Sequence, residues 1–164
     1  MGVLFSHCSK SKSEIFDFAG TFPARKTSKG GRKEFAIRME DRPGTLGKVC
    51  RALADRGVSI LAFQSLPSGG ESLVRLVVDN PTTAKTVLDT QRLNYTEAEV
   101  VQVKLAHRPG ELARAASRLG DANININYAY CGVEAGTNAP LLIFGLAEVG
   151  RALTILEQVA AAGT

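Results

Sequence analysis

Residues that build metal sites and covalent frameworks are scarce in this chain of 164 residues. Its three cysteines, Cys8, Cys50 and Cys131, are widely spaced and odd in number, which excludes a disulfide scaffold and matches no zinc-binding spacing. The two histidines, His7 and His107, lie too far apart in the sequence for a His-rich metal site. No apolar run reaches the roughly 20 residues that a helix needs to cross a bilayer. We therefore expect neither a bound metal nor a membrane span.

The excess of positive charge is confined to the first 33 residues. The chain has 20 Lys and Arg against 16 Asp and Glu, a net charge of +4. Residues 1–33 hold seven basic and two acidic residues, so residues 34–164 hold 13 basic and 14 acidic ones, a net charge of −1. Because a nucleic-acid-binding domain needs a basic surface, we expect no nucleic-acid partner.

Residues 1–33 have no sustained helical or strand periodicity and are rich in Ser, Lys and Gly, which is typical of a flexible linker. They lack the apolar stretch of a secretory signal, and we expect a cytoplasmic protein. Met1-Gly2 followed by Ser6 fits the N-myristoylation pattern. Because so short a pattern often occurs by chance, we expect a flexible basic tail that does not contact a membrane.

The rest of the chain contains one segment twice. Residues 34–65 align without a gap with residues 100–131, at an offset of 66 positions. Arg-Pro-Gly at 42–44 coincides with Arg-Pro-Gly at 108–110, and apolar residues coincide at several positions: Leu46 with Leu112, Leu53 with Leu119, and Ile60 with Ile126. This indicates a tandem duplication, with domains expected at residues 34–99 and 100–164.

Hydrophobic periodicity predicts the same elements in each copy. The first strand alternates apolar and polar residues, as at Phe35, Ile37 and Met39, which is typical of a sheet with one buried face. The next helix, with Pro43 or Pro109 at its start, has apolar residues at i, i+3, i+4 and i+7. These residues are Leu46, Val49, Cys50 and Leu53 in one copy and Leu112, Ala115, Ala116 and Leu119 in the other. Gly57 and Asn123 suit the left-handed turn that ends each helix.

Further strands are expected at 58–65 and 72–78 in the first copy, joined by a hairpin at Pro67-Ser68-Gly69-Gly70. In the second copy they are expected at 124–131 and 141–147, joined by a hairpin from Gly132 to Pro140. A second helix follows in each copy, beginning at Asn80-Pro81 in the first. Residues 95–99 form the fourth strand of the first copy and run directly into the second copy. The order βαββαβ predicts an α+β fold of two ferredoxin-like units, antiparallel sheets with both helices on one face. The second copy ends after its helix, so its sheet has three strands, or a partner or the N-terminal segment completes it.

The motif [D/H]-R-P-G-x-L after an alternating strand, followed by a Val-Ser-Ile or Ile-Asn-Ile strand, resembles the ACT domain. Two copies with almost no spacer resemble the small stand-alone tandem ACT proteins, and the resemblance covers about residues 34–160. It implies a regulatory module that binds a small molecule, usually an amino acid, and that pairs with another ACT copy. The family's ligands lie near the loop between the first strand and first helix, against the second strand of a neighbouring copy. The matching positions are Asp41, Arg42, Pro43, Gly44, Thr45 and Leu46; His107, Arg108, Pro109, Gly110, Glu111 and Leu112; and Asn125 and Asn127.

The chemistry of the two loops also favours ligand binding, independently of the resemblance. A helix start has unpaired backbone N–H groups and a partial positive charge, which suit a carboxylate, and a glycine there allows close approach. Asp41 would balance an ammonium group or cap its own helix. Because His107 replaces Asp41 and Glu111 replaces Thr45, the two loops bind different ligands or only one binds. His107 is expected to be a surface residue, with pH-dependent binding as the alternative.

Asn125 and Asn127 are expected on one face of a strand, where they bind a ligand or partner strand or simply face solvent. Tyr128 and Tyr130 are expected as core or interface aromatics. Cys50 is expected to pack in the core as an inert thiol, and Cys131 to be partly exposed at a strand end.

No phosphate-binding loop, nucleophile elbow or paired-carboxylate motif occurs, so we expect no catalysis and no cofactor. One hypothesis is an amino-acid sensor whose ligand shifts its association with a partner enzyme or regulator. The alternative is a non-catalytic regulatory subunit of a metabolic enzyme that binds no free amino acid. Exposed edge strands favour a homodimer in either case.

Overall fold

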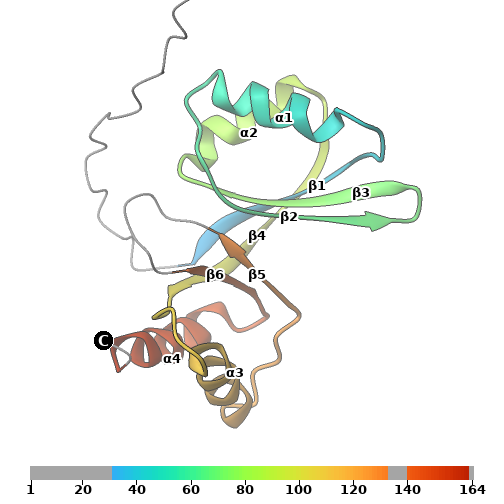
Figure 1. The fold of residues 1–164 in the computed structure, drawn as a ribbon. Coiled ribbons are helices and arrows are strands. Elements are labelled where there is room, and N and C mark those ends of the chain that lie inside the picture. Colours follow the sequence, from blue (N-terminus) through green and yellow to red (C-terminus); the bar gives the residue numbers. More distant parts are fainter. Residues whose placement is uncertain (1–30, 133–139, 163–164) are drawn as a thin grey trace, which may run out of the picture.

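The computed structural model describes residues 31–132 and 140–162, which form six strands and four helices (Figure 1). The elements are β1 (Arg32–Glu40), α1 (Thr45–Ala54), β2 (Ile60–Ser68), β3 (Glu71–Val78), α2 (Pro81–Thr90), β4 (Asn94–Lys104), α3 (Glu111–Asp121), β5 (Tyr128–Gly132), β6 (Leu141–Gly145) and α4 (Val149–Ala161). The element order agrees with the prediction. Most of the expected tail and of the hairpin after Gly132 lies outside the described residues, but Arg32 and Lys33, expected in the tail, belong to β1.

The strands form one closed antiparallel barrel in the order β1-β3-β2-β5-β6-β4. The residues up to Val100 form a β4-β1-β3-β2 sheet, the ferredoxin-like order expected for a first unit. We call residues 31–100 the first half and residues 101–162 the second half. The α+β fold with antiparallel strands agrees with the prediction, but the strands form one barrel rather than one sheet in each unit, because β2 meets β5 at the pair Ala62–Gly132 and β4 runs unbroken from one half into the other.

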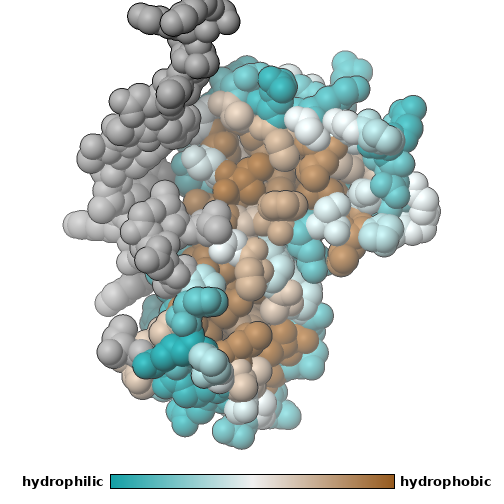
Figure 2. Space-filling view, viewed as in Figure 1, coloured by the Kyte–Doolittle hydropathy of each residue, from teal (hydrophilic) through white to brown (hydrophobic). Residues whose placement is uncertain are grey.

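The helices form two outer layers with the sheet strands between them. Figure 1 shows α1 and α2 over the first half and α3 and α4 over the second, on opposite sides of the molecule. Each helix pair covers a core of its own, one built on Phe35, Ile37 and Leu88 and the other on Val103, Leu119 and Phe144. Hydrophobic residues also gather in the middle of the face seen in Figure 2, between the hydrophilic outer parts. A third apolar cluster lies inside the barrel and joins the halves: Ala62, Val77, Val100, Tyr130, Leu141 and Ile143.

The predicted helix stripes are confirmed at most positions. Val49 and Leu53 are buried on α1, as are Ala115 and Leu119 on α3. Leu112 is different, because its side chain is 54% exposed. It lies in the first turn of α3, where the helix starts beyond the edge of the core.

The helices start later than the prolines predicted. Thr45 and Glu111 are the first residues of α1 and α3, and the residues before them, Gly44 and Gly110, have φ of 87° and 92°. Only glycine adopts this conformation without steric cost, so the Pro-Gly pair makes the turn that precedes each helix. The left-handed helix ends are confirmed, at Gly57 with φ 67° and at Asn123 with φ 58°.

The second strand of the second half is shorter than predicted. β5 covers 128–132, whereas Asn125 and Asn127 precede it, with the Asn127 N–H bonded to the Gly145 carbonyl at 3.0 Å. Ile124 and Ile126 pack on the helix-covered core, but Tyr128 and Tyr130 point into the barrel. A regular strand would place these four side chains on one face. The backbone therefore changes face between Ile126 and Tyr128.

Two local predictions for the first half are confirmed. The Asn80 side chain accepts a hydrogen bond from the Thr83 N–H at 3.2 Å, and Pro81 begins α2. Gly69 and Gly70, with φ of 61° and 87°, form the two-residue hairpin between β2 and β3. In the part of the chain that the structure describes, no helix has the length and apolar character needed to cross a membrane.

Candidate functional site

The loop before α1 keeps polar groups at the edge of the first half. The Asp41 carboxylate accepts a hydrogen bond from the Ser72 hydroxyl at 3.0 Å, at the start of β3. Arg42 forms an exposed ion pair with Glu40. No side chain caps α1, so the expectation that Asp41 caps its own helix is wrong. The start of this helix therefore has backbone donors with no competing side-chain acceptor of its own.

The loop before α3 already contains an acidic group. Glu111, the first residue of α3, accepts hydrogen bonds from Arg108 Nη2 at 3.0 Å and from Arg114 Nη2 at 2.6 Å. The hydrogen bond from Arg114, followed in importance by the one from Arg108, lowers the pKa of the Glu111 carboxyl. The same Arg114 nitrogen also binds the Val159 carbonyl of α4 at 2.8 Å. A negative charge thus sits at this helix start, where it competes with an anionic ligand.

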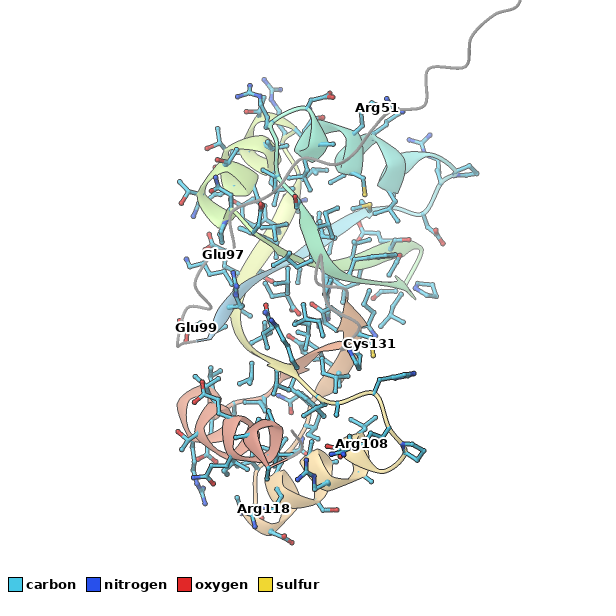
Figure 3. All side chains as sticks on the ribbon, turned by 60° about the vertical axis from the view of Figure 1, so that its left-hand side comes forward. Arg51, Glu97, Glu99, Arg108, Arg118 and Cys131 are labelled. Atoms are coloured by element: carbon cyan, nitrogen blue, oxygen red, sulfur yellow. The ribbon has the colours of Figure 1, made fainter. Side chains whose placement is uncertain are left out.

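The two loops do not form one site. Figure 3 shows Arg108 beside α3, at the opposite end of the molecule from α1. Asn125 and Asn127 are also separate from the loop at 107–112. They lie next to Tyr128, which pairs with Gly145, whereas the loop follows Lys104 at the other end of the β4–β6 ladder. Both asparagines are exposed, and the Asn125 amide donates to the Asn127 side chain at 2.9 Å.

An apolar pocket of about 470 Å³ lies beside α1. Its residues come from α1, from the first part of β2 and from the end of β5: Leu46, Cys50, Ile60, Leu61, Ala62, Phe63, Cys131 and Gly132. Phe63 is 56% exposed, so it offers an apolar surface that a bound molecule would cover. Of the residues expected from the sequence, Leu46 alone lines this pocket, which connects the first turn of α1 to the contact between the halves.

The two thiols at this pocket differ in exposure, and Cys50 lines the pocket rather than packing inside the core as expected. Cys50 is partly buried, and its burial raises the pKa of the thiol, so it stays protonated and unreactive at neutral pH. Cys131 is exposed and lies in the middle of the molecule, near the junction of the halves (Figure 3). Within the described ranges, no three His, Cys, Asp or Glu side chains gather as metal ligands would.

A buried polar cluster crosses the barrel interior. Glu34 of β1 is fully buried, and its carboxylate accepts hydrogen bonds at 2.7 Å from Arg75 of β3 and from the hydroxyls of Tyr128 and Tyr130 of β5. The Arg75 guanidinium carbon also lies 3.8 Å from the centre of the Tyr128 ring, a cation–π contact. These bonds join the first half to the second.

The surroundings of the tyrosines suppress their ionisation. Burial, and then the hydrogen bond to Glu34, raise the pKa of Tyr128 to about 12 and raise the pKa of Tyr130 as well. The interpretation of both tyrosines as core or interface aromatics is confirmed. Glu34 was not among the predicted site residues, because it lies on the polar face of a strand for which only the apolar face was expected to be buried.

The family comparison agrees with the resemblance seen in the sequence. Residues 34–93 match the model of the ACT domain. The first half of this chain therefore contains an ACT domain. Comparison with curated proteins gave no match.

Solved structures share the whole described fold. Protein BT0572 from Bacteroides thetaiotaomicron has a TM-score of 0.71 at 20% identity, covering 80% of this chain and 90% of that one. The regulatory subunits of aspartate kinase from Thermus thermophilus and Thermus flavus have TM-scores of 0.55 at 19% and 18% identity, each covering 79% of this chain and 92% of the subunit. At these identities the likeness establishes the fold.

Proposed function

We propose that this chain is a non-catalytic, cytoplasmic regulatory protein that binds an amino acid with an apolar side chain in the pocket beside α1. The observation that supports this is the pocket itself, whose lining joins the first turn of α1 to the contact between the halves. At about 470 Å³ it lies within the size range of small-molecule sites. Its apolar lining favours a hydrocarbon or thioether side chain over a charged one.

The backbone of the ligand would bind at the loop of residues 41–46. The uncapped N-terminus of α1 supplies N–H donors and a partial positive charge for the α-carboxylate. The Asp41 carboxylate, held by Ser72, is available for the α-ammonium group. The equivalent loop at residues 107–112 has Glu111 in place of Thr45, so we propose that the first half alone binds the ligand.

We also propose that residues 100–164 form a second ACT-like unit that holds the pocket in place. The second half repeats the strand and helix order of the first and supplies Cys131 and Gly132 to the pocket. A ligand there touches both halves, so its binding energy would depend on how they pack. That dependence would let it change the affinity of the protein for a partner enzyme.

Calorimetric and thermal titration of the full chain with the twenty amino acids tests this. A ligand that binds the native state alone adds about 2.7 kcal/mol at one hundred times its Kd, which raises Tm by several degrees. We expect stabilisation by one or more of leucine, isoleucine, valine, methionine and phenylalanine, and none by aspartate or lysine.

Filling the pocket provides the matched control. Cys50→Leu adds a net two non-hydrogen atoms to a side chain that lines the pocket and should weaken binding at least tenfold. Ala116→Leu makes a comparable change at the position 66 residues later, on α3, and should leave binding unchanged. Equal effects of the two variants would argue against this pocket.

The alternative, a subunit that binds a metabolic enzyme and no free amino acid, is favoured by one observation. Phe63 of β2 is 56% exposed beside the apolar pocket, and an exposed apolar surface of this kind is typical of protein contacts. Twenty flat titrations, together with a stable complex with a metabolic enzyme that Phe63→Ser disrupts, would favour this function over the sensor.

A further inference from the structure

The pocket beside α1 is larger than the side chain of any amino acid proposed to bind there. Its volume is about 470 Å³. At roughly 30 Å³ for each carbon, the share of one water molecule in the liquid, the side chain of leucine occupies roughly 120 Å³ and that of phenylalanine roughly 210 Å³. Each leaves more than half of the pocket unfilled, so the lining loses the van der Waals contacts of a close-packed site.

The side chains of the lining offer little to a polar group. Among the described residues that form the pocket, none has a side chain with a charge, an amide or a hydroxyl group. The two polar atoms that these side chains hold are the thiols of Cys50 and Cys131, and burial raises the pKa of the Cys50 thiol, which keeps it uncharged at neutral pH. Because burying a polar group without a hydrogen-bond partner is costly, the part of a ligand inside the pocket has to be hydrocarbon.

The pocket is also elongated. Leu46 and Cys50 lie one helical turn apart on α1, a rise of about 6 Å. The stretch Ile60–Phe63 covers about 10 Å along β2. On the far side, Cys131 lies in the middle of the molecule, well away from Arg51 of α1 (Figure 3). A compact, branched side chain fills one end of such a space, whereas an unbranched chain fills its length.

From this size, lining and shape, we propose that the pocket binds an unbranched acyl chain of about ten carbons, which takes up roughly 300 Å³. The polar end group of the ligand stays in solvent beside Phe63, which is exposed. This inference rests on the pocket of the proposed function but not on amino-acid binding, because it extends the ligands of that pocket to medium-chain acyl compounds. The acyl chain and an apolar amino acid both occupy the part of the pocket beside α1, so they compete.

A series of straight-chain carboxylates tests the chain length. The full chain is titrated by calorimetry with butyrate, hexanoate, octanoate, decanoate and dodecanoate, each below the concentration at which it forms micelles. We expect one site per chain and a Kd that falls about fourfold for each methylene that enters the pocket. The fall should stop at about ten carbons, where the pocket is full. The absence of a saturable site for decanoate, or a gain that continues unchanged to dodecanoate as on an open apolar surface, would overturn the proposal. Titration with decanoyl-coenzyme A then shows whether the free acid or a thioester with the same chain binds more tightly.

A pair of matched variants on β5 tests the place of binding. Cys131→Phe narrows the far end of the pocket, and Ala129→Phe is its control. Ala129 lies two residues earlier on the same face of the strand and is also exposed, but it is not part of the lining. We expect Cys131→Phe to raise the Kd of decanoate at least tenfold and to move the limit of the series to shorter chains, with Ala129→Phe unchanged. Equal effects of the two variants would mean that the chain binds elsewhere.

Titration with leucine separates this proposal from the amino-acid sensor. Leucine bound beside Leu46 and Cys50 should keep its Kd in Cys131→Phe and should be displaced by decanoate. Saturable binding of decanoate without a response to any amino acid would support the acyl site and reject the amino-acid ligand. Binding of leucine without binding of decanoate would support the amino-acid sensor and overturn the acyl site.

Discussion

Glu34 holds the two halves together from inside the barrel. Its carboxylate is fully buried and accepts three hydrogen bonds, one from Arg75 and two from tyrosine hydroxyls. A buried charge is tolerated when its lone pairs are all occupied, but the loss of one member leaves the others without compensation. The cluster therefore makes the packing of the halves specific.

Glu34→Gln should lower the free energy of unfolding by about 2–4 kcal/mol, because the amide leaves Arg75 without its counter-charge and offers one acceptor atom instead of two. Urea denaturation measures the change. Glu40→Gln on the same strand is the control: it breaks the exposed pair with Arg42 and should cost less than about 1 kcal/mol. Equal losses of unfolding free energy in the two variants would mean that the buried cluster of Glu34 stabilises the fold no more than the exposed ion pair of Glu40 does.

The two barrel tyrosines predict a loss of stability in alkali. The pKa of Tyr128 is raised to about 12 from an unfolded value of about 10, so the folded state keeps the proton longer. This contribution is complete below about pH 10 and is lost as the pH rises toward about 12. Tyr128→Phe should make the decline of the unfolding free energy over this range shallower, as measured by urea denaturation at a series of pH values. An unchanged slope would contradict the assignment.

The start of α1 depends on a backbone conformation that the sequence predicts only in part. Arg-Pro-Gly indicates a turn and a helix nearby, but the helix begins after Gly44 rather than at Pro43. The reason is that φ at Gly44 is 87°, which places the turn before the helix.

Gly44→Ala and Gly47→Ala should therefore have opposite effects. At Gly44 an alanine must adopt a left-handed φ, which costs about 1–2 kcal/mol of unfolding free energy. Gly47 lies within α1 with open space around it, so alanine there should add about 0.5–1 kcal/mol. Thermal unfolding of both variants measures the difference, and an unchanged or raised stability of Gly44→Ala would show that Gly44 is under no backbone constraint.

Elements with strong local signals were predictable, and those set by distant contacts were not. The Asn80-Pro81 helix start and the Gly69-Gly70 hairpin are encoded by adjacent residues, and the structure has both. Asn125 and Asn127 alternate as in a strand, but their segment must turn over so that Tyr128 reaches Glu34. The contact that requires this is made by Glu34 of β1, which lies 94 residues away from Tyr128 in the sequence.

The closed barrel follows from contacts that no single segment specifies. Alternation in β1 correctly placed Phe35, Ile37 and Met39 against the helices. It could not indicate that the opposite face is buried at Glu34, because that burial depends on the tyrosines of β5 in the second half. The same holds for the pocket: Leu46 was expected at the site, but Cys131 and Gly132 join it only because β2 meets β5.

Because β4 and the central cluster belong to both halves, the molecule should unfold as one unit. Leu88→Ala in the first core should cost about 2–5 kcal/mol, since Leu88 is 1% exposed. Native-state hydrogen exchange should then show an equal loss of protection in β3 and in β6. A loss confined to β3 would mean that the halves unfold separately.

The continuous strand β4 also restricts how the gene for this protein can change in length. The residues on either side of the junction, Val100 and Val101, are both fully buried, one facing the barrel and the other facing α3 and α4. One codon inserted there would exchange the two faces of everything that follows, turning Gln102 into the helix-covered core and Val103 toward the barrel. Most tandem domains tolerate a longer linker between them. In this chain the junction has no linker to lengthen, so insertions and deletions should be confined to the loops.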